Sequence, residues 1–412
     1  MGLANSNANT TARVTRRSSH GRSGGWLILT NLLAMLPIQF VDLAGQHAPL
    51  QPALLAACQR VLAAGDFIQG AEVAAFAHEL SQLLSGAAVV PCANGTDALQ
   101  LALMSLQLPP GTEVIVPAFT YVATLEAAAV LGLRPVVADV LPDTFMLDPA
   151  AVAAALTPRT GAIVAVHLFG QCANLEALRA LADQHGVALL EDNAQALGAA
   201  YTFSNGQMRL AGTVGEVGTT SFFPSKNLGG FGDGGALFTR DAARAEQLRQ
   251  LANHGQTHKY HHQHIGLNSR LDTLQAALLR VKLPYLAAWT AARQRTAARY
   301  DELFAHVSGV KPPARDPQST HTFHQYVVTL PTATHRDQLR AYLLQHGVPT
   351  AVYYPLPVHE QPAYTYLGYR QGQFPVAEQL CRTVLALPVH PTLTDEQVDY
   401  IAETVRIGLR NE

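Results

Sequence analysis

Short apolar segments alternate with amphipathic segments from residue 51 to residue 330, and this alternation is the strongest constraint on the fold. Near-continuous apolar strands between helices are typical of a parallel sheet that is covered on both faces. The pattern therefore predicts an α/β fold with a mostly parallel central sheet. The predicted strands are 113–116, 134–139, 162–168, 187–191 and 235–239, and the predicted helices are 51–64, 73–84, 98–106, 121–131, 175–185 and 242–253. Such sheets bind ligands beyond the carboxyl ends of their strands, so chemically active residues are expected there.

The pattern changes after residue 284. Pro284 follows an apolar helix at 274–283, and a long helical segment at 285–307 comes next. Beyond it, the sequence predicts strands at 326–330 and 348–354 and helices at 336–345 and 395–409. We therefore predict a large domain at 35–284 and a smaller C-terminal α/β domain at 285–412.

Composition disfavours two classes of partner. The formal net charge is −2 over 412 residues, so no global field attracts nucleic acid or an anionic membrane. No segment is basic enough for a DNA-binding domain. The four cysteines are scattered without a Cys-x-x-Cys pair, which predicts reduced thiols in a cytoplasmic protein rather than disulfides. They are Cys58, Cys92, Cys172 and Cys381.

The first 34 residues differ from the rest. Polar and basic residues dominate up to Gly25, and residues 26–36 are mostly apolar, which imitates a secretory signal. The apolar run is shorter than the ~20 residues that span a bilayer, and no convincing cleavage site follows it. Met35 begins a segment that is typical of a normal start. The prediction for 1–34 is a disordered tail or a misassigned start, with export as the alternative.

The segment 187–195 places an acidic residue at the carboxyl end of a predicted strand. Its sequence is VALLEDNAQ, so an apolar strand delivers Asp192 to the sheet edge. A carboxylate there can bind a metal, act as a base, or pair with a cation such as a pyridinium nitrogen, which it keeps protonated. Gln195 follows three residues later and can donate a hydrogen bond to a ring phenolate. The structural alternative is that Asp192 caps a following helix.

Lys226 is the single cation in the segment 219–236, which otherwise holds mainly small and apolar residues. A lysine in such surroundings has a lowered pKa and can act as a Schiff-base nucleophile. Ser221 precedes it by five residues and can bond a phosphate oxygen. The alternative is a solvated surface lysine, which the neighbouring Phe222, Phe223 and Pro224 make less favourable.

Two further segments, one before a predicted helix and one after a predicted strand, can also contact a ligand. Gly95 and Thr96 precede a helical segment, so their loop and the helix N-terminus can bind an anion. An ordinary helix start is the alternative. After the strand at 113–116, Tyr121 or Phe119 can stack on a flat ring, with a core position as the alternative.

Together these segments supply a phosphate site, a stacking aromatic ring, a pyridinium partner, a phenolate donor and a Schiff-base lysine. They occur in the order expected for the large domain of a fold-type I pyridoxal 5'-phosphate (PLP) enzyme. From residue 40 to about residue 391, the chain resembles the DegT/DnrJ/EryC1/StrS family of PLP-dependent nucleotide-sugar aminotransferases. The most specific segments are 93–100 (ANGTDALQ), 191–196 (EDNAQA), 221–229 (SFFPSKNLG) and 266–277 (GLNSRLDTLQAA).

The resemblance implies a homodimer with active sites at the subunit interface. In that arrangement Asn268 and Arg270 reach into the partner's site, with Asn268 near the cofactor phosphate and Arg270 near the substrate. Tyr353 and Tyr354 are expected in the sugar pocket. Many relatives have His-Tyr-Pro where this chain has Tyr-Tyr-Pro. Because of this difference, the substrate of those relatives cannot be assigned directly to this chain. Some relatives are dehydratases with a histidine at the position of Lys226, so the lysine favours transamination.

The resemblance also implies L-glutamate as donor and a nucleotide-linked ketosugar as acceptor, in polysaccharide or glycan biosynthesis. Segments 92–100 and 254–262 are most similar to enzymes that aminate a UDP-3-oxo-N-acetylglucosaminuronate. Segments 363–369 and 374–378 are more similar to those that aminate dTDP-3-oxo-6-deoxyhexoses. A 4-oxo nucleotide sugar, a PLP-dependent dehydratase and a non-catalytic PLP-binding regulator are the remaining alternatives.

A histidine-rich stretch invites a metal interpretation. A solvated loop that becomes ordered at the dimer interface is the better prediction, because metal sites need convergent ligands and oriented second shells. We therefore predict no metal site. The histidines are His258, His261, His262 and His264.

Overall fold

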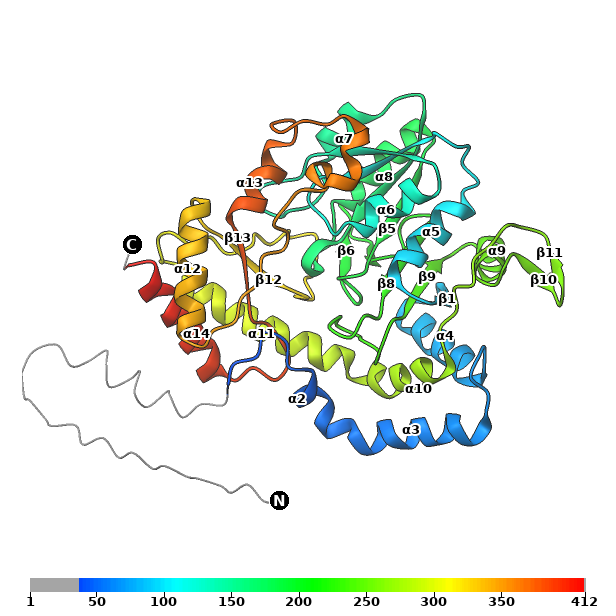
Figure 1. The fold of residues 1–412 in the computed structure, drawn as a ribbon, viewed down its shortest axis with the longest axis horizontal. Coiled ribbons are helices and arrows are strands. Elements are labelled where there is room, and N and C mark those ends of the chain that lie inside the picture. Colours follow the sequence, from blue (N-terminus) through cyan, green and yellow to red (C-terminus); the bar gives the residue numbers. More distant parts are fainter. Residues whose placement is uncertain (1–36, 411–412) are drawn as a thin grey trace, which may run out of the picture. The chain divides into compact units, whose positions relative to one another are not determined.

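The structure, a computed structural model, describes residues 37–410, and the predicted tail at 1–34 lies outside this range. A seven-stranded sheet has the strand order β1-β9-β8-β5-β4-β2-β3 (Figure 1). Within it, β9 runs antiparallel to β1 and β8, and the other neighbouring pairs are parallel. The predicted mostly parallel α/β sheet is therefore confirmed. Its strands are β1 (Ala88–Cys92), β2 (Glu113–Pro117), β3 (Arg134–Ala138), β4 (Thr160–Val166), β5 (Ala188–Asp192), β8 (Val217–Ser221) and β9 (Gly235–Thr239).

The helices around the sheet form groups that follow from their apolar spacing. In α3, the buried residues Leu54, Ala57 and Val61 repeat at helical intervals and face α10. Helix α5 packs between α6 and α9, whereas α7 packs on α8. Helices α5 to α9 pack with the sheet in the largest core. The bounds are α3 (Gln51–Ala64), α4 (Ala71–Leu83), α5 (Gly95–Ser105), α6 (Ala123–Val130), α7 (Pro149–Ala155), α8 (Leu175–His185), α9 (Ala242–Ala252) and α10 (Thr273–Lys282).

A smaller sheet forms in the C-terminal part, where β12 and β13 pair in antiparallel orientation. A second core packs between this sheet and three helices, two of which, α12 and α14, lie side by side (Figure 1). Helix α11 links the central sheet to this second core, because Leu286 packs in a cluster with residues of β1 and β9, and Phe304 packs in the second core. The domain boundary near residue 285 stays a prediction. The bounds are α11 (Leu286–Phe304), β12 (Tyr326–Thr329), α12 (Ala333–Gln345), β13 (Val384–Leu387) and α14 (Asp395–Gly408).

The predicted strand at 348–354 is wrong. Only Ala351 in that stretch forms a bridge, with Ala386, because Pro349 has no N–H to donate and Pro355 ends the segment. The patterns at β1, β8 and β13 were too short or too polar to predict a strand. No helix in the described range is both long and apolar enough to cross a bilayer. The remaining elements include α2 (Leu43–His47), α13 (Pro375–Thr383), β6 (Ala200–Thr202), β7 (Met208–Leu210), β10 (Gln256–His258) and β11 (His261–His262).

Candidate active site

The parallel strands β4, β5 and β8 end at one edge of the central sheet, and a cavity of about 450 Å³ opens there. This volume is typical of sites for small ligands. Nine residues that the sequence predicts for the site line the cavity, so the structure brings them together. They are Gly95, Thr96, Tyr121, Asp192, Gln195, Ser221, Lys226, Tyr353 and Tyr354.

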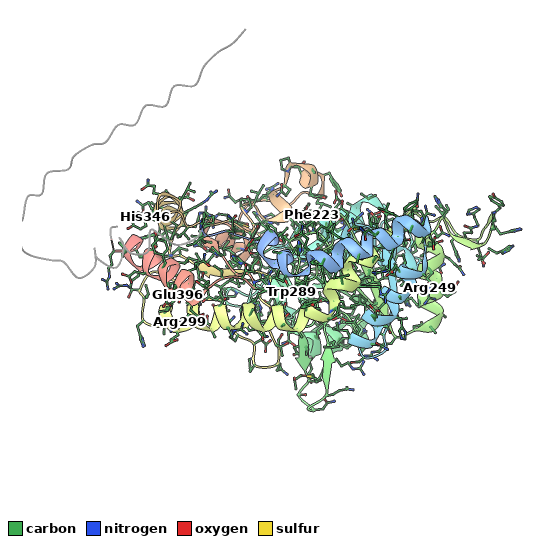
Figure 2. All side chains as sticks on the ribbon, turned by 90° about the horizontal axis from the view of Figure 1, so that it is seen from below. Phe223, Arg249, Trp289, Arg299, His346 and Glu396 are labelled. Atoms are coloured by element: carbon green, nitrogen blue, oxygen red, sulfur yellow. The ribbon has the colours of Figure 1, made fainter. Side chains whose placement is uncertain are left out.

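Lys226 lies in the turn that follows β8, where its backbone N–H donates to the Phe223 carbonyl at 2.8 Å. Among the described residues, no side chain or carbonyl forms a hydrogen bond or ion pair with its amine. Burial lowers the pKa of Lys226 to about 8, and the Asp192 carboxylate opposes this shift. The ring of Phe223 (Figure 2) also lines the cavity and is 52% exposed. Lys226 is therefore a partly buried, unpaired amine that loses its proton more readily than an exposed lysine.

Asp192 is the last residue of β5, and its carboxylate is already held in place. One oxygen accepts a hydrogen bond from Thr124 Oγ1 at 2.8 Å, and the other accepts the Ala194 N–H at 3.2 Å. A turn rather than a helix follows Asp192, so the interpretation of this residue as a helix cap is wrong. A fixed, 6% exposed carboxylate at the cavity wall can pair with a protonated ring nitrogen.

Glu191 precedes Asp192 and points to the other face of β5, because side chains alternate along a strand. It is fully buried with His167, whose Nε2 lies 2.9 Å from the carboxylate. The backbone N–H groups of Gly212, Val214 and Gly215 also donate to this carboxylate. Burial alone would raise the pKa of Glu191, but these hydrogen bonds lower it overall. The hydrogen bonds to the Glu191 carboxylate thus hold the end of β5 in place on the face opposite Asp192.

The N-terminus of α5 provides a place for an anion. The helix begins at Gly95, and Asn94 caps it by accepting the Asp97 N–H at 2.8 Å. A Cβ atom at Gly95 would lie 2.8 Å from the Ser221 Cβ, so only glycine lets the helix approach the end of β8 this closely. The hydroxyls of Thr96 and Ser221 flank this terminus. The dipole of α5, the free backbone N–H groups at its N-terminus and the two hydroxyls together suit the binding of a phosphate.

Aromatic rings cover another part of the cavity wall. Tyr121 and Tyr354 have ring centroids 6.1 Å apart. Gln195 fixes Tyr354, since its amide nitrogen donates to the phenol oxygen at 3.1 Å while its amide oxygen accepts the Phe169 N–H at 2.6 Å. Burial raises the pKa of Tyr354 above its usual range, so the phenol keeps its proton. Phe119 is a core residue, 1% exposed, and Tyr121 is the available stacking ring.

Two predicted site residues lie outside this cavity. Asn268 and Arg270 line a neighbouring hollow, which shares Asn94 and Asp233 with the cavity. Arg270 donates to the Asn253 side chain at 3.1 Å. Neither residue reaches the cavity of its own chain.

The histidine-rich stretch forms a short hairpin of β10 and β11 rather than the predicted loop (Figure 1). The rings of His258 and His261 stack with centroids 3.9 Å apart. Among described residues, the group that comes close enough to hold a metal lies elsewhere and consists of His359, Glu360 and Glu378. There the Glu378 carboxylate already accepts two backbone N–H groups and pairs with His359 at 3.4 Å.

The residues that the sequence did not predict include one that supports Asp192 and several in the cavity wall. Thr124 holds Asp192, and Phe169, His324 and Gln325 line the cavity. His324 and Gln325 come directly before β12, at the amino end of a strand in the smaller sheet. Because ligands are expected beyond the carboxyl ends of central-sheet strands, the sequence contains no signal for His324 and Gln325.

The arrangement fits PLP, as judged from this chain's own residues. An unpaired amine, a fixed carboxylate and a helix N-terminus with two hydroxyls face one cavity, beside an accessible aromatic ring. These groups match the carbonyl, the ring nitrogen, the phosphate and the flat ring of that cofactor. The fit rests on donor types and placement rather than on fold likeness.

Comparison with known proteins identifies the family. Residues 50–406 match the model of the DegT/DnrJ/EryC1/StrS aminotransferase family. The chain belongs to this family. The sequence resemblance is thereby confirmed, and the chain is a PLP-dependent sugar aminotransferase with the fold of that class; solved relatives include forms with PLP or PMP.

Similar members of the family carry different names. The chain is 43% identical to the UDP-2-acetamido-2-deoxy-3-oxo-D-glucuronate aminotransferase of Pseudomonas aeruginosa, covering 88% of this chain and 98% of that one. It is 41% identical to a dTDP-3-amino-3,4,6-trideoxy-alpha-D-glucose transaminase of Streptomyces venezuelae, covering 90% and 95%. It is also 42% identical to a pleiotropic regulatory protein of Geobacillus stearothermophilus, covering 89% and 97%. The crystal structure of S. venezuelae DesV in complex with a ketimine intermediate superposes with a TM-score of 0.86 at 41% identity, covering 90% and 98%.

Proposed function

We propose that this aminotransferase moves the amino group of L-glutamate to the C3 ketone of a nucleotide-linked sugar of the UDP-2-acetamido-3-oxo-glucuronate type. The product would serve polysaccharide or glycan biosynthesis in the cytoplasm. The observation that carries the proposal is the unpaired amine of Lys226, with its pKa lowered to about 8, in a cavity walled by Asp192. The relatives that act on 3-oxo sugars support the acceptor class.

The residues divide the work as follows. Bound PLP supplies a ring that withdraws electrons from the reacting carbon and nitrogen. Asp192 would keep the ring nitrogen protonated, and Gly95, Thr96 and Ser221 would hold the phosphate. Lys226 would hold the cofactor covalently until the amine of glutamate takes its place. The free Lys226 amine would then take the proton from the α-carbon of glutamate as general base and, as general acid, deliver it to the reactive carbon of the cofactor rather than back to glutamate.

Tyr121 would stack on the ring, and Gln195 would donate a hydrogen bond to its phenolate oxygen. Tyr121 is accessible for stacking, and Gln195 is held by its bonds to Phe169 and Tyr354. Tyr353 and Tyr354 would line the sugar end of the cavity. Burial raises the pKa of Tyr353 as well, so both phenols would offer neutral hydroxyls to the sugar.

The homodimer forms part of the proposal. Asn268 is exposed, and Arg270 is partly exposed in the hollow beside the cavity. In a dimer these residues would complete the partner's site, with Asn268 toward the phosphate and Arg270 toward the substrate. Equilibrium sedimentation at micromolar concentration tests this assembly, and a monomer that is fully active would contradict it.

A dTDP-3-oxo-6-deoxyhexose is the second candidate acceptor, because the S. venezuelae transaminase is nearly as similar as the P. aeruginosa enzyme. A 4-oxo nucleotide sugar is a weaker one. A non-catalytic role is the alternative that the G. stearothermophilus relative raises by its name. The lysine at position 226 disfavours a dehydratase.

One experiment separates these functions. Purified protein with PLP and L-glutamate is offered UDP-3-oxo and dTDP-3-oxo sugars, and 2-oxoglutarate and the aminated sugar are followed by mass spectrometry. We expect both products in equal amounts with the UDP-3-oxo acceptor. A regulator would give neither product, and a dehydratase would change the sugar without consuming glutamate.

A further inference from the structure

Gln325 brings a side-chain amide to the wall of the cavity that holds Lys226. Both residues line this cavity, and Gln325 is only 7% exposed. Among the described residues, none forms a hydrogen bond with this amide, whose oxygen and nitrogen both retain accessible surface. The amide is therefore open to the cavity, where a ligand can use its N–H donors and its oxygen acceptor.

Another buried glutamine shows how the protein treats an amide that serves only its structure. Gln171 is 2% exposed and lies outside the cavity. Its amide oxygen accepts the Asp316 N–H at 3.0 Å, and its amide nitrogen donates to the Ala314 carbonyl at 3.4 Å. Both ends of that amide are used within the protein, which is the usual state of a buried amide. The Gln325 amide is buried without such bonds, so it is suited to bind a molecule that enters the cavity.

The backbone that carries Gln325 is fixed relative to the cofactor residues. The Gln325 N–H donates to the Phe169 carbonyl at 3.3 Å. Three positions earlier, the Thr322 N–H donates to the Gly170 carbonyl at 2.8 Å. The Thr322 carbonyl accepts the side-chain N–H of Asn227, which follows the reactive lysine in sequence, at 3.0 Å. The amide therefore keeps a defined place in the cavity wall.

Phe169 connects Gln325 to Gln195. Its carbonyl accepts the Gln325 N–H, and its own N–H donates to the Gln195 amide oxygen at 2.6 Å. Gln195 is the residue proposed to donate to the phenolate oxygen of PLP. That oxygen and the reactive carbon of PLP are bonded to neighbouring ring atoms. Gln325 thus lies on the side of the cavity where a substrate would join the cofactor.

The cavity wall is poor in positive charge. Among the described residues that line it, Lys226 is the one lysine or arginine, and the proposed function assigns it to the cofactor. Burial, together with the charges of Lys226 and Arg293, holds the pKa of His324 well below its usual value, so its ring is uncharged. Glutamate carries two carboxylates. Arg270 from a partner subunit can pair with one of them, and the other then needs neutral donors.

We propose that Gln325 binds the α-carboxylate of glutamate by donating its amide N–H, and binds a hydroxyl beside the ketone when the sugar takes the same place. An amide suits both ligands, whereas a fixed cation would be left buried and unpaired opposite an uncharged hydroxyl. Gln325 thereby holds the α-carbon of glutamate within reach of the Lys226 amine. This inference rests on the proposed function, which names glutamate as the donor.

The test is the half-reaction of the PLP-loaded protein with L-glutamate in the absence of a sugar, followed by stopped-flow absorbance of the bound cofactor. Gln325→Leu keeps the bulk of the side chain but has no donor. We expect the glutamate concentration at half-maximal rate to rise about tenfold, as for a lost hydrogen bond to a charged group, with the limiting rate within about threefold of the wild type. Gln325→Glu should raise this concentration further, because its carboxylate repels that of the ligand.

A ligand analogue and a second glutamine serve as controls. 4-Aminobutyrate keeps the amine and the distal carboxylate of glutamate but lacks the α-carboxylate, so its inhibition constant in this half-reaction should change less than about twofold in Gln325→Leu. Gln46 is also 7% exposed and lies outside the cavity. Gln46→Leu should leave the glutamate concentration at half-maximal rate unchanged. The melting temperature of cofactor-free Gln325→Leu should equal or exceed that of the wild type, because no protein group loses a partner.

The inference is overturned if Gln325→Leu leaves the glutamate concentration at half-maximal rate unchanged, or if it weakens glutamate and 4-aminobutyrate equally. Gln325→Met replaces the leucine variant, with the same expectation, if the latter does not fold. Failure of the proposed function looks different. In that case the wild-type protein would show no change in cofactor absorbance with glutamate, and the role of Gln325 would fall with the donor.

Discussion

Two lysines of this chain have lowered pKa values, and their surroundings differ completely. Burial lowers the pKa of Lys226 and of Lys282 to about 8 in both cases. Lys282 is 1% exposed at the end of α10, and its amine donates to the Gly229 carbonyl and lies 2.8 Å from His47 Nε2. The Lys226 amine faces the cavity, and no described residue bonds to it.

A lowered pKa therefore indicates only that a lysine is buried. An amine that has no hydrogen-bond partner and faces a cavity indicates, in addition, that the lysine can react. The Lys282 amine also lies 5.2 Å from the ring centre of Phe231 and 6.0 Å from that of Trp289 (Figure 2). These partners use its donor capacity for packing. Lys282 therefore holds the glycine-rich turn after Lys226 in place, and Lys226 is free for chemistry.

Removing the reactive amine should have the largest effect. We expect Lys226→Ala to abolish the visible absorbance of bound cofactor and to reduce turnover by on the order of 10⁴-fold or more, because both covalent attachment and proton transfer are lost. Absorbance spectroscopy and the glutamate-dependent assay measure these changes. The melting temperature of the cofactor-free variant should match the wild type. Substantial turnover in Lys226→Ala would contradict the distinction between a reactive Lys226 and a structural Lys282.

Removing the charge opposite Lys226 should have the next largest effect. Asp192→Asn keeps an acceptor for Thr124 but no longer holds a ring nitrogen protonated. We expect kcat to fall about 10²- to 10³-fold. Thr124→Val is the matched control, since it removes only the 2.8 Å bond to Asp192 and should cost a few-fold. Equal losses in the two variants would show that orientation, not charge, is what Asp192 supplies.

Replacing the structural lysine should affect stability rather than chemistry. Lys282→Met leaves the Gly229 carbonyl and His47 without their partner, which costs about 1–3 kcal/mol of unfolding free energy at pH 9.5. Urea unfolding measures this loss. We expect kcat to stay within about threefold of the wild type. A loss of kcat as large as that of Lys226→Ala would erase the distinction between the two lysines.

The pH dependence of that stability difference should be the smallest effect. A lysine of pKa about 8 in the folded state and about 10.4 in the unfolded state binds fewer protons when folded between these values. The stability that Lys282 provides therefore rises from pH 8 to pH 10. Between pH 9.5 and pH 7.5, the gap between wild type and Lys282→Met should narrow. A gap that widens toward pH 7.5 would mean that burial does not lower this pKa.

The sequence predicted the site residues by two different signals. Asp192 ends a predicted strand, so the rule about the carboxyl ends of parallel strands locates it. Ser221 ends β8, which the sequence did not predict, and Ser221 and Lys226 were found instead from the small and apolar residues around the lysine. Tyr353 and Tyr354 came from family resemblance alone. Their stretch looked like a strand because it is β-branched and aromatic, and the prolines at either side override that tendency.

His324 shows why the rest could not be predicted. Its position depends on a chain segment from the smaller sheet that crosses to Gly170 and Asn227, more than 90 positions away in sequence. Local spacing contains no signal for such a contact. The hydrogen bond from Thr124 to Asp192 depends in the same way on a contact between residues 68 positions apart, at the start of α6 and the end of β5.

Glu191 and Asp192 at the end of β5 point to opposite faces of the strand, and this arrangement affects how the cofactor binds. Glu191 is locked by His167 and three backbone donors, so the strand end keeps its shape whether or not anything occupies the front. Asp192 is therefore already in position when the cofactor ring binds, and little conformational entropy is lost on binding. Apoprotein and holoprotein should accordingly show the same hydrogen-exchange protection along β5, and reconstitution should follow a single exponential without a slow folding phase.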